Sequence, residues 1–109
     1  MGLTKTDLFT QEQNELATAC KVLGHPARIA ILQFLSSADM CITGDIVDEI
    51  GLAQPTISQH LRELKKIDII QGTIEGTSVC YCINKNKWEE LSELINGLFK
   101  DHHPDVKCC

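Results

Sequence analysis

The sequence lacks any stretch suited to a membrane or to secretion. No apolar run approaches the roughly 20 residues that a transmembrane helix requires, and the start of the chain shows no basic segment followed by an apolar core. We therefore expect a cytoplasmic protein with no membrane partner. Internal repeats and low-complexity linkers are also missing, so 109 residues predict one domain, 1–109, with short flexible tails at 1–9 and 101–109.

Positive charge is scarce as well. Ten Lys and Arg face 15 Asp and Glu, which gives a net charge of -5. Since non-specific affinity for nucleic acids comes from basic side chains meeting phosphates, this balance argues against a general polyanion binder. A role on nucleic acid must rest on local charge. The chain has six cysteines, and without a signal peptide they favour buried residues, thiol sensors or soft-metal ligands over a disulfide scaffold.

Helical periodicity predicts three helices in the first half of the chain. Thr10 and Gln13 fit a capping box that begins the first helix, and Gly24 ends it. Pro26 stands in the first turn of a second, strongly apolar helix. A short third helix is predicted over 44–50.

The stretch LAQPTISQHLREL, residues 52–64, predicts a fourth helix with two unlike faces. Pro55 lies in its first turn, and an inner stripe is formed by Ile57, Leu61 and Leu64. At about 100° per residue, the opposite face carries short hydrogen-bonding side chains and basic ones. The outward residues are Thr56, Gln59, Arg62, Glu63 and Lys66, with Ser58 and His60 on the flanks.

After residue 68 the apolar period changes to two. The segments IIQGTIEG and TSVCYCIN predict a β-hairpin with a turn near 75–78. Val79, Tyr81 and Ile83 share one face of the second strand, and Cys80 and Cys82 share the other. Asn86 is then expected to cap a last helix, with Glu89 three residues on.

This order predicts a mainly α fold with a β-hairpin wing, a winged helix-turn-helix in the order α-α-α-α-β-β-α. The fourth helix is then a recognition helix, because its outer side chains can hydrogen-bond base edges or phosphates. The alternatives are an ordinary solvated helix face and a winged helix that binds protein instead of DNA. Candidate DNA contacts are Gln54, Thr56, Ser58, Gln59, His60, Arg62 and Lys66.

These segments resemble one known family. KVLGHPARIAILQFL (21–35) resembles the second-helix signature of the ArsR/SmtB family of winged-helix repressors, LAQPTISQHLREL its recognition helix, and VCYCI (79–83) its second wing strand. The resemblance covers about 12–99. It implies a homodimer bound to a palindromic double-stranded DNA operator, and repression relieved by an inducer, often a metal ion or As(III). It implies no enzyme and no required cofactor.

The resemblance places the dimer interface on the first and last helices, and their apolar stripes support this independently. The expected interface residues are Leu16, Leu23, Trp88, Leu91, Ile95 and Leu98.

The chain departs from the family where inducers bind. Arsenic-sensing members carry Cys-x-Cys ahead of the third helix, whereas here Cys41 is followed by Thr43, and a hydroxyl is a poor ligand for a thiophilic ion. The last helix contains no His, so the zinc-type site of the family looks absent. The wing carries Glu75 and no base near its tip, which makes wing contacts to DNA doubtful.

Thiols remain the candidate sensors. Cys41 with Cys108 and Cys109 would supply three thiolates to As(III), although the tail pair could equally belong to a disordered end. Cys80 and Cys82 are a competing pair, too far apart along a strand for an easy mutual disulfide. Oxidation of a Cys pair is a further alternative trigger.

The other potential ligands are expected to be structural. Cys20 lies on an apolar stripe and is predicted to be core. His25 is expected at a helix entry and His60 on a helix flank, more a packing residue than a ligand. His102 and His103 are predicted to be solvated. A Cys/His enzyme is disfavoured because no local signature supports a nucleophile.

Overall fold

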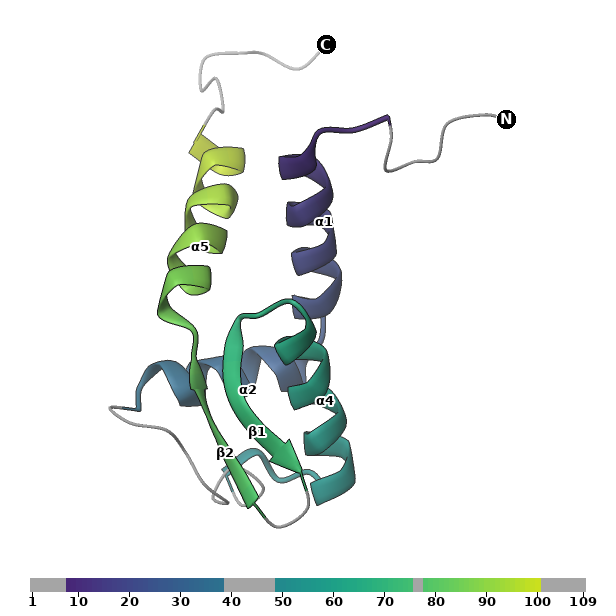
Figure 1. Cartoon of the computed structure of the whole chain (residues 1–109), viewed down its shortest axis with the longest axis vertical. Coiled ribbons are helices and arrows are strands. Elements are labelled where there is room, and N and C mark those ends of the chain that lie inside the picture. The colour runs from purple at the N-terminus through teal and green to yellow at the C-terminus, as the bar shows by residue number, and fades with distance from the viewer. Residues whose placement is uncertain (1–7, 39–48, 76–77, 101–109) are drawn as a thin grey trace.

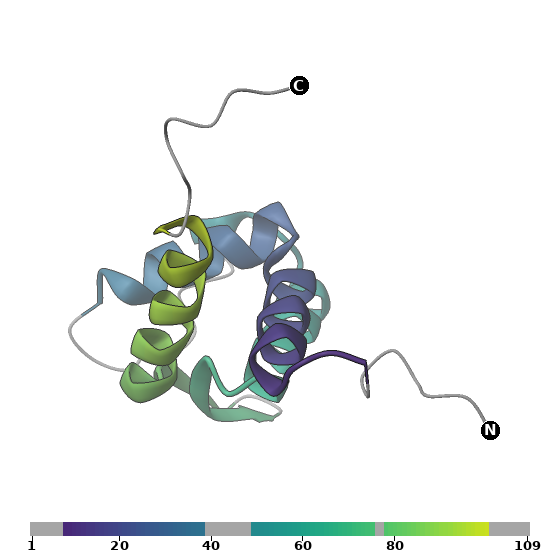
Figure 2. The ribbon, with the colours of Figure 1, turned by 90° about the horizontal axis from the view of Figure 1, so that it is seen from above.

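In the computed structural model, the described residues are 8–38, 49–75 and 78–100. Figure 1 shows α2, α4 and a hairpin joined in one body, from which α1 and α5 rise at the same end of the molecule. Figure 2 looks down on these two helices, which contact each other. No helix in the described ranges is long and apolar enough to cross a membrane. The elements are α1 (Gln11–Leu23), α2 (Pro26–Ser36), α4 (Gln54–Lys66), β1 (Ile70–Glu75), β2 (Ser78–Ile83) and α5 (Lys85–Lys100).

The starts of α1 and α2 follow the sequence signals. Thr10 Oγ1 accepts a hydrogen bond from the Gln13 N–H at 3.1 Å, and the Gln13 side chain accepts one from the Thr10 N–H at 2.9 Å, which confirms the capping box. Pro26 opens α2. His25 caps this helix, since its Nδ1 accepts from the backbone N–H two residues on at 3.1 Å. Both helices are therefore fixed by local side-chain chemistry.

The predicted third helix lies mostly outside the described residues. Glu49 and Ile50 are helical, and Gly51 follows with φ +84°, a left-handed conformation that glycine adopts most readily. After this turn α4 begins at Gln54, with Pro55 in its first turn. The turn of a helix-turn-helix therefore lies at 51–53.

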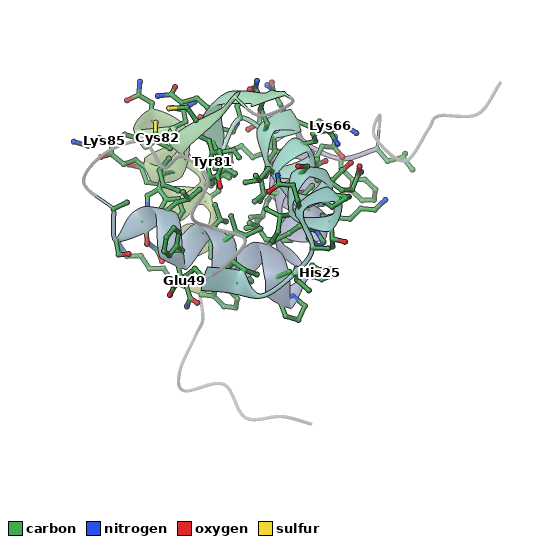
Figure 3. All side chains as sticks on the ribbon, turned by 90° about the horizontal axis from the view of Figure 1, so that it is seen from below. His25, Glu49, Lys66, Tyr81, Cys82 and Lys85 are labelled. Carbon is green, nitrogen blue, oxygen red and sulfur yellow. The ribbon has the colours of Figure 1, made fainter. Side chains whose placement is uncertain are left out.

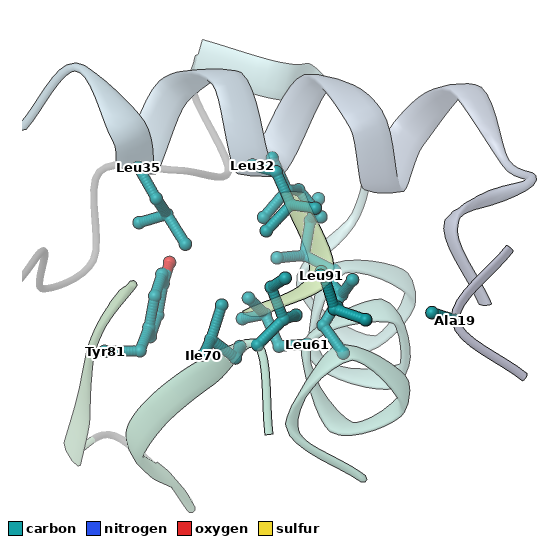
Figure 4. Packing of buried hydrophobic residues seen from close by; sticks show 11 residues of the cluster. Ala19, Leu32, Leu35, Leu61, Ile70, Tyr81 and Leu91 are labelled. Carbon is teal, nitrogen blue, oxygen red and sulfur yellow. The ribbon is translucent and has the colours of Figure 1, made fainter. Parts of the chain in front are cut away.

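The core is built around the inner stripe of α4 (Figure 4). Ile57, Leu61 and Leu64 are fully buried, against Ile31 of α2 and the fully buried Tyr81 of β2. Burying such a side chain stabilises the fold by about 1.5–3 kcal/mol relative to exposure. Among the described residues, the cluster consists of Ala19, Ile31, Leu32, Leu35, Ile57, Leu61, Leu64, Ile69, Ile70, Tyr81 and Leu91.

The hairpin is antiparallel, with Gln71 opposite Cys82 and Gly72 opposite Tyr81. Because Tyr81 points into the core, Cys82 and Cys80 lie on the outer face, as the period of two predicted. Gly72 has φ +131°, and a Cβ there would lie 2.0 Å from the carbonyl oxygen of Cys80. The two strands therefore approach too closely at this point for any other residue.

Two local predictions are wrong. Asn86 was expected to cap the last helix, but α5 already begins at Lys85, and the cap is Asn84, whose carbonyl accepts from the Trp88 N–H at 2.9 Å. Both asparagines suit a cap, and the end of β2 selects the earlier one. Cys20 was expected in the core but is exposed in this chain.

The reason for the second error is the line along which α1 packs. α1 contacts α2, α4 and α5, and Ala19 is its buried residue. The small side chain of Ala19 lets these helices approach. Leu16, Cys20 and Leu23 lie on the neighbouring line of α1, where the two leucines are half-buried and Cys20 is exposed. The core-facing line therefore runs beside the predicted stripe.

Candidate nucleic-acid interface

The face of α4 opposite the core carries the predicted polar residues. Ser58 is half-buried, and the others of the set, except His60, are exposed, because the inner stripe fixes the rotation of the helix. The exposed members are Gln54, Thr56, Gln59, Arg62 and Lys66.

Side-chain hydrogen bonds run along this face one turn apart. Gln54 Nε2 donates to Ser58 Oγ at 3.0 Å, and Gln59 Nε2 donates to Glu63 Oε1 at 3.4 Å. Such i,i+4 pairs order the side chains on an exposed helix. Each glutamine amide offers both a donor and an acceptor, the pattern that matches the edge of adenine in the major groove.

The positive charge of α4 is local and mostly on this face. Lys66 Nζ lies 3.0 Å from Glu63 Oε1, and this hydrogen bond lowers the pKa of the Glu63 carboxyl. Lys65 Nζ donates to the carbonyl oxygen of Gly72 and so ties α4 to β1. Arg62 makes no hydrogen bond or ion pair with another residue in the described ranges. Although the chain as a whole is acidic, this face of α4 therefore exposes the basic side chain of Arg62.

His60 does not belong to this face, which corrects the predicted contact set. Its side chain is 8% exposed, and its Nδ1 accepts from Arg28 Nε at 3.1 Å. The His60 ring centroid lies 4.4 Å from that of His25, and Arg28 also donates to the carbonyl of Val22 at 3.0 Å. Burial lowers the pKa of His60, and the neighbouring His25 and Arg28 lower it further. This residue joins α4 to the start of α2.

The sequence is similar to known regulators in the region that builds this face. The model of the family described as bacterial regulatory protein, arsR family, matches residues 25–71, from the cap of α2 into β1. An uncharacterized HTH-type transcriptional regulator of Methanocaldococcus jannaschii, MJ1325, is 36% identical over 89 residues, which cover 81% of this chain and 99% of the relative. The chain belongs to the arsR family of bacterial regulatory proteins.

Other arsR-family relatives carry different functional names. An arsenical resistance operon repressor of Staphylococcus xylosus is 33% identical over 82 residues, covering 75% of this chain and 74% of its own length. A biofilm growth-associated repressor of Xylella fastidiosa is 28% identical over 97 residues, covering 89% and 81%. The protein is thus a DNA-binding repressor of winged helix-turn-helix fold and not an enzyme.

The apolar residues expected at an arsR-type dimer interface fall into two groups. Leu98 is 59% exposed and Trp88 36%, whereas Leu91 is 3% exposed and belongs to the core of the chain itself, which corrects its assignment. Leu91 lines the space between α5 and the body, together with Leu32 of α2 and Ile69. Leu16, Leu23 and Ile95 are half-buried. The interface set omitted Phe99, which is 72% exposed beside Leu98.

Of the predicted thiol sites, the pair on β2 lies among the described residues. Cys80 is exposed and Cys82 half-buried on β2, and neither forms a disulfide with a described residue. The described ranges contain no group of three or more His, Cys, Asp or Glu side chains placed to hold a metal ion. The candidate ligands Cys41, Cys108 and Cys109 lie outside the described residues, as do His102 and His103, which were predicted to be solvated.

Proposed function

We propose that the protein is a homodimeric, cytoplasmic repressor that inserts α4 into the major groove of a palindromic operator. The observation that carries this proposal is the pairing of Gln59 and Arg62, both exposed, on the face of α4 opposite the fully buried Leu61. The proposed DNA contacts are Gln54, Thr56, Ser58, Gln59, Arg62 and Lys66.

The chemistry of these side chains suggests a division of roles. The amides of Gln54 and Gln59 suit base edges, above all adenine, and the guanidinium of Arg62 suits guanine or a phosphate. Ala53 is the N-cap of α4 and makes no side-chain cap hydrogen bond. Since a helix start carries unpaired N–H groups and a partial positive charge, the start of α4 is suited to a backbone phosphate.

The exposed ends of α1 and α5 support the homodimer. Phe9, Leu98 and Phe99 are more than half exposed, and Trp88 is 36% exposed. Large apolar patches are rare on monomers, so a second copy would cover them. Two α4 helices would then meet half-sites about one helical turn apart, or a multiple of it. Light scattering at micromolar concentration tests this, and a stable, well-folded monomer would contradict it.

Operator binding is tested by fluorescence anisotropy with DNA from the region upstream of the protein's own gene. Gln59→Ala and Arg62→Ala are expected to weaken binding by about 1–3 kcal/mol if each loses a base contact. If Arg62 meets a phosphate, the salt slope falls by about one instead.

The matched controls are Gln33→Ala and Lys21→Ala, which remove a side-chain amide and a positive charge from exposed positions of α2 and α1. Both should bind like the unmodified protein. Unchanged affinity in both α4 variants would reject α4 as the recognition helix, and absence of any DNA binding would favour a protein-interaction module.

For the effector we propose a thiophilic species, As(III), bound by Cys41 with Cys108 and Cys109. The support is the chemistry of the sequence: Thr43 removes one thiol, and the adjacent tail pair restores a set of three. One relative is named as an arsenical resistance operon repressor. Strain at Cys41, just ahead of the first helix of the helix-turn-helix, would then re-aim α4.

Release from DNA is measured against As(III), Cd(II), Zn(II) and peroxide. Replacing Cys108 and Cys109 with Ser should abolish release by As(III), whereas the matched Cys20→Ser change should leave it intact. If the double variant leaves its operator at the same As(III) concentration, the tail is not the sensor. Release by peroxide alone would favour the redox alternative.

A further inference from the structure

The outer face of the hairpin carries two thiols on one strand. Tyr81 lies between Cys80 and Cys82 and is fully buried, so its two neighbours are forced to the opposite face. Figure 3 shows Cys82 on the outer side of the hairpin and Tyr81 directed inward. Cys80 is exposed and Cys82 half-buried, so both are reachable from solvent.

The strand that carries them is held in place at this point. Gly72 approaches the carbonyl of Cys80 so closely that a Cβ would lie 2.0 Å from its oxygen. The side chain of Lys65 donates to the carbonyl of Gly72, which fastens β1 to α4 on the same stretch. The thiols therefore stand on a fixed strand rather than on a loop, and a ligand they share would find them already aligned.

The spacing favours one shared ion over a disulfide. Residues two apart on a strand are separated by roughly 6.6 Å, whereas a disulfide needs Cβ atoms about 3.5–4.5 Å apart. Two thiolates on opposite sides of one metal ion lie roughly 4.6 Å apart, twice a metal–sulfur bond of about 2.3 Å. Side chains on a strand lean along its direction, so the two sulfurs can close to that separation without moving the backbone.

Among the described residues, these two thiols are the only candidate ligands at this place. Gln71 lies opposite Cys82, and its Nε2 donates to the sulfur at 3.8 Å, which gives a metal-bound thiolate a hydrogen-bond partner but no further ligand. No described His, Cys, Asp or Glu completes a group of three with these thiols. Zn(II) requires four ligands in a tetrahedron, and As(III) three thiolates, whereas Cu(I) is soft and is satisfied by two.

We propose that Cys80 and Cys82 bind one Cu(I) ion in linear, two-thiolate coordination on the outer face of the wing. Two thiol protons are released and two copper–sulfur bonds form, with no change in oxidation state. This site goes beyond the proposed function, because it depends neither on DNA binding nor on the thiols at 41, 108 and 109.

The first test uses the full chain with Cys20, Cys41, Cys108 and Cys109 all replaced by Ser. Under anaerobic conditions it is titrated with Cu(I) held by a chromophoric chelator. We expect one Cu(I) per chain, two sulfur neighbours and no third in the X-ray absorption spectrum, and no comparable binding of Zn(II). Adding Cys80→Ser or Cys82→Ser should lower the affinity at least tenfold.

Failure to take Cu(I) from the chelator, equal binding by a one-thiol variant, or equal binding of Zn(II) would each overturn the proposal. Circular dichroism checks that every variant is folded.

A second test leaves the chain unmodified and so does not depend on the serine background. The tryptic peptide 67–85 contains both wing thiols and no other cysteine, and the peptide 6–21 contains Cys20 alone. With excess Cu(I), alkylation of Cys80 and Cys82 should slow at least tenfold together, while Cys20, a single exposed thiol, reacts as before. Unchanged alkylation of the wing pair, or equal protection of Cys20, contradicts a two-thiol site.

Discussion

The apolar side chains of the molecule are buried to different degrees in two regions. One region is the body, formed by α2, α4 and the hairpin, and the other is the helix pair α1 and α5. The largest fully buried side chains, from Ile31 to Tyr81, all belong to the body. The helix pair contributes Ala19 and Leu91 to the core and leaves Leu98 and Phe99 exposed. The body thus holds most of the core, and the exposed side chains of the helix pair are those that the proposed dimer would cover.

The seam between the two halves is also less filled. A cavity of about 290 Å³ lies where α5 meets α2 and the end of α1, with Ile29, Trp88 and Ile95 among its lining residues. This space opens to solvent and most of its lining side chains are apolar, so a partner chain packed on this face would also cover it. This difference between the halves predicts that some substitutions will affect one half and leave the other unchanged.

The largest effect is expected from the core of α4. Leu64→Ala removes a fully buried side chain that packs inside the body, and such changes lower the free energy of unfolding by about 2–5 kcal/mol. Urea denaturation followed by circular dichroism measures the loss.

The matched change in the helix pair is Leu98→Ala, on a side chain that is 59% exposed. Its effect on the fold of one chain should be small, and it should instead shift the concentration at which dimers form. Equal destabilisation by the two variants, independent of protein concentration, would remove the distinction between the halves.

Effects of opposite sign in the two halves are expected from alanine at two glycines. In the body, Gly72→Ala places a Cβ 2.0 Å from the Cys80 carbonyl oxygen at φ +131°; the backbone strain alone costs about 1–3 kcal/mol. In α5, Gly97→Ala meets no atom within 4 Å and should add about 0.5–1 kcal/mol through helix propensity. Thermal unfolding at fixed concentration measures both. A stabilising Gly72→Ala would refute the close strand approach.

Much of the fold could be predicted from the sequence because its signals are local. The capping box at Thr10, the Pro at the start of α2 and the inner stripe of α4 each depend on residues within one or two turns. The alternation that turned Cys80 and Cys82 outward depends only on the strand period. Each of these features depends on the residues of one helix or strand alone.

The errors concern contacts between elements. The flank position of His60 gave no indication that Arg28, 32 residues away in the sequence, would donate to it and draw it into the protein. Cys20 fitted the stripe of α1, yet the line of closest approach to three other helices runs through Ala19. Leu91 has the spacing of an interface residue but lies where α5 meets the body. The periodicity of apolar residues predicts which face of a helix is buried, but it does not predict which element packs against that face.

The smallest change in the free energy of unfolding is expected on lowering the pH. It should arise in the body, where α2 and α4 meet at His60. The groups that face His60 are His25 and Arg28, and burial first and then these two lower its pKa below the usual 6.5. The unfolded chain therefore binds a proton that the folded chain resists, so stability is fully present above about pH 6.5 and falls as the pH drops below it.

Urea midpoints measured from pH 8 to pH 5, at constant protein concentration, should fall more steeply for the unmodified protein than for His60→Gln. A glutamine oxygen can still accept from Arg28 but does not titrate, so the difference between the two profiles isolates the imidazole. His25→Gln, which changes the exposed neighbour, should keep most of the acid dependence. If the His60→Gln profile runs parallel to that of the unmodified chain, the proton that weakens the body binds elsewhere, and the junction between α2 and α4 is insensitive to the charge of this histidine.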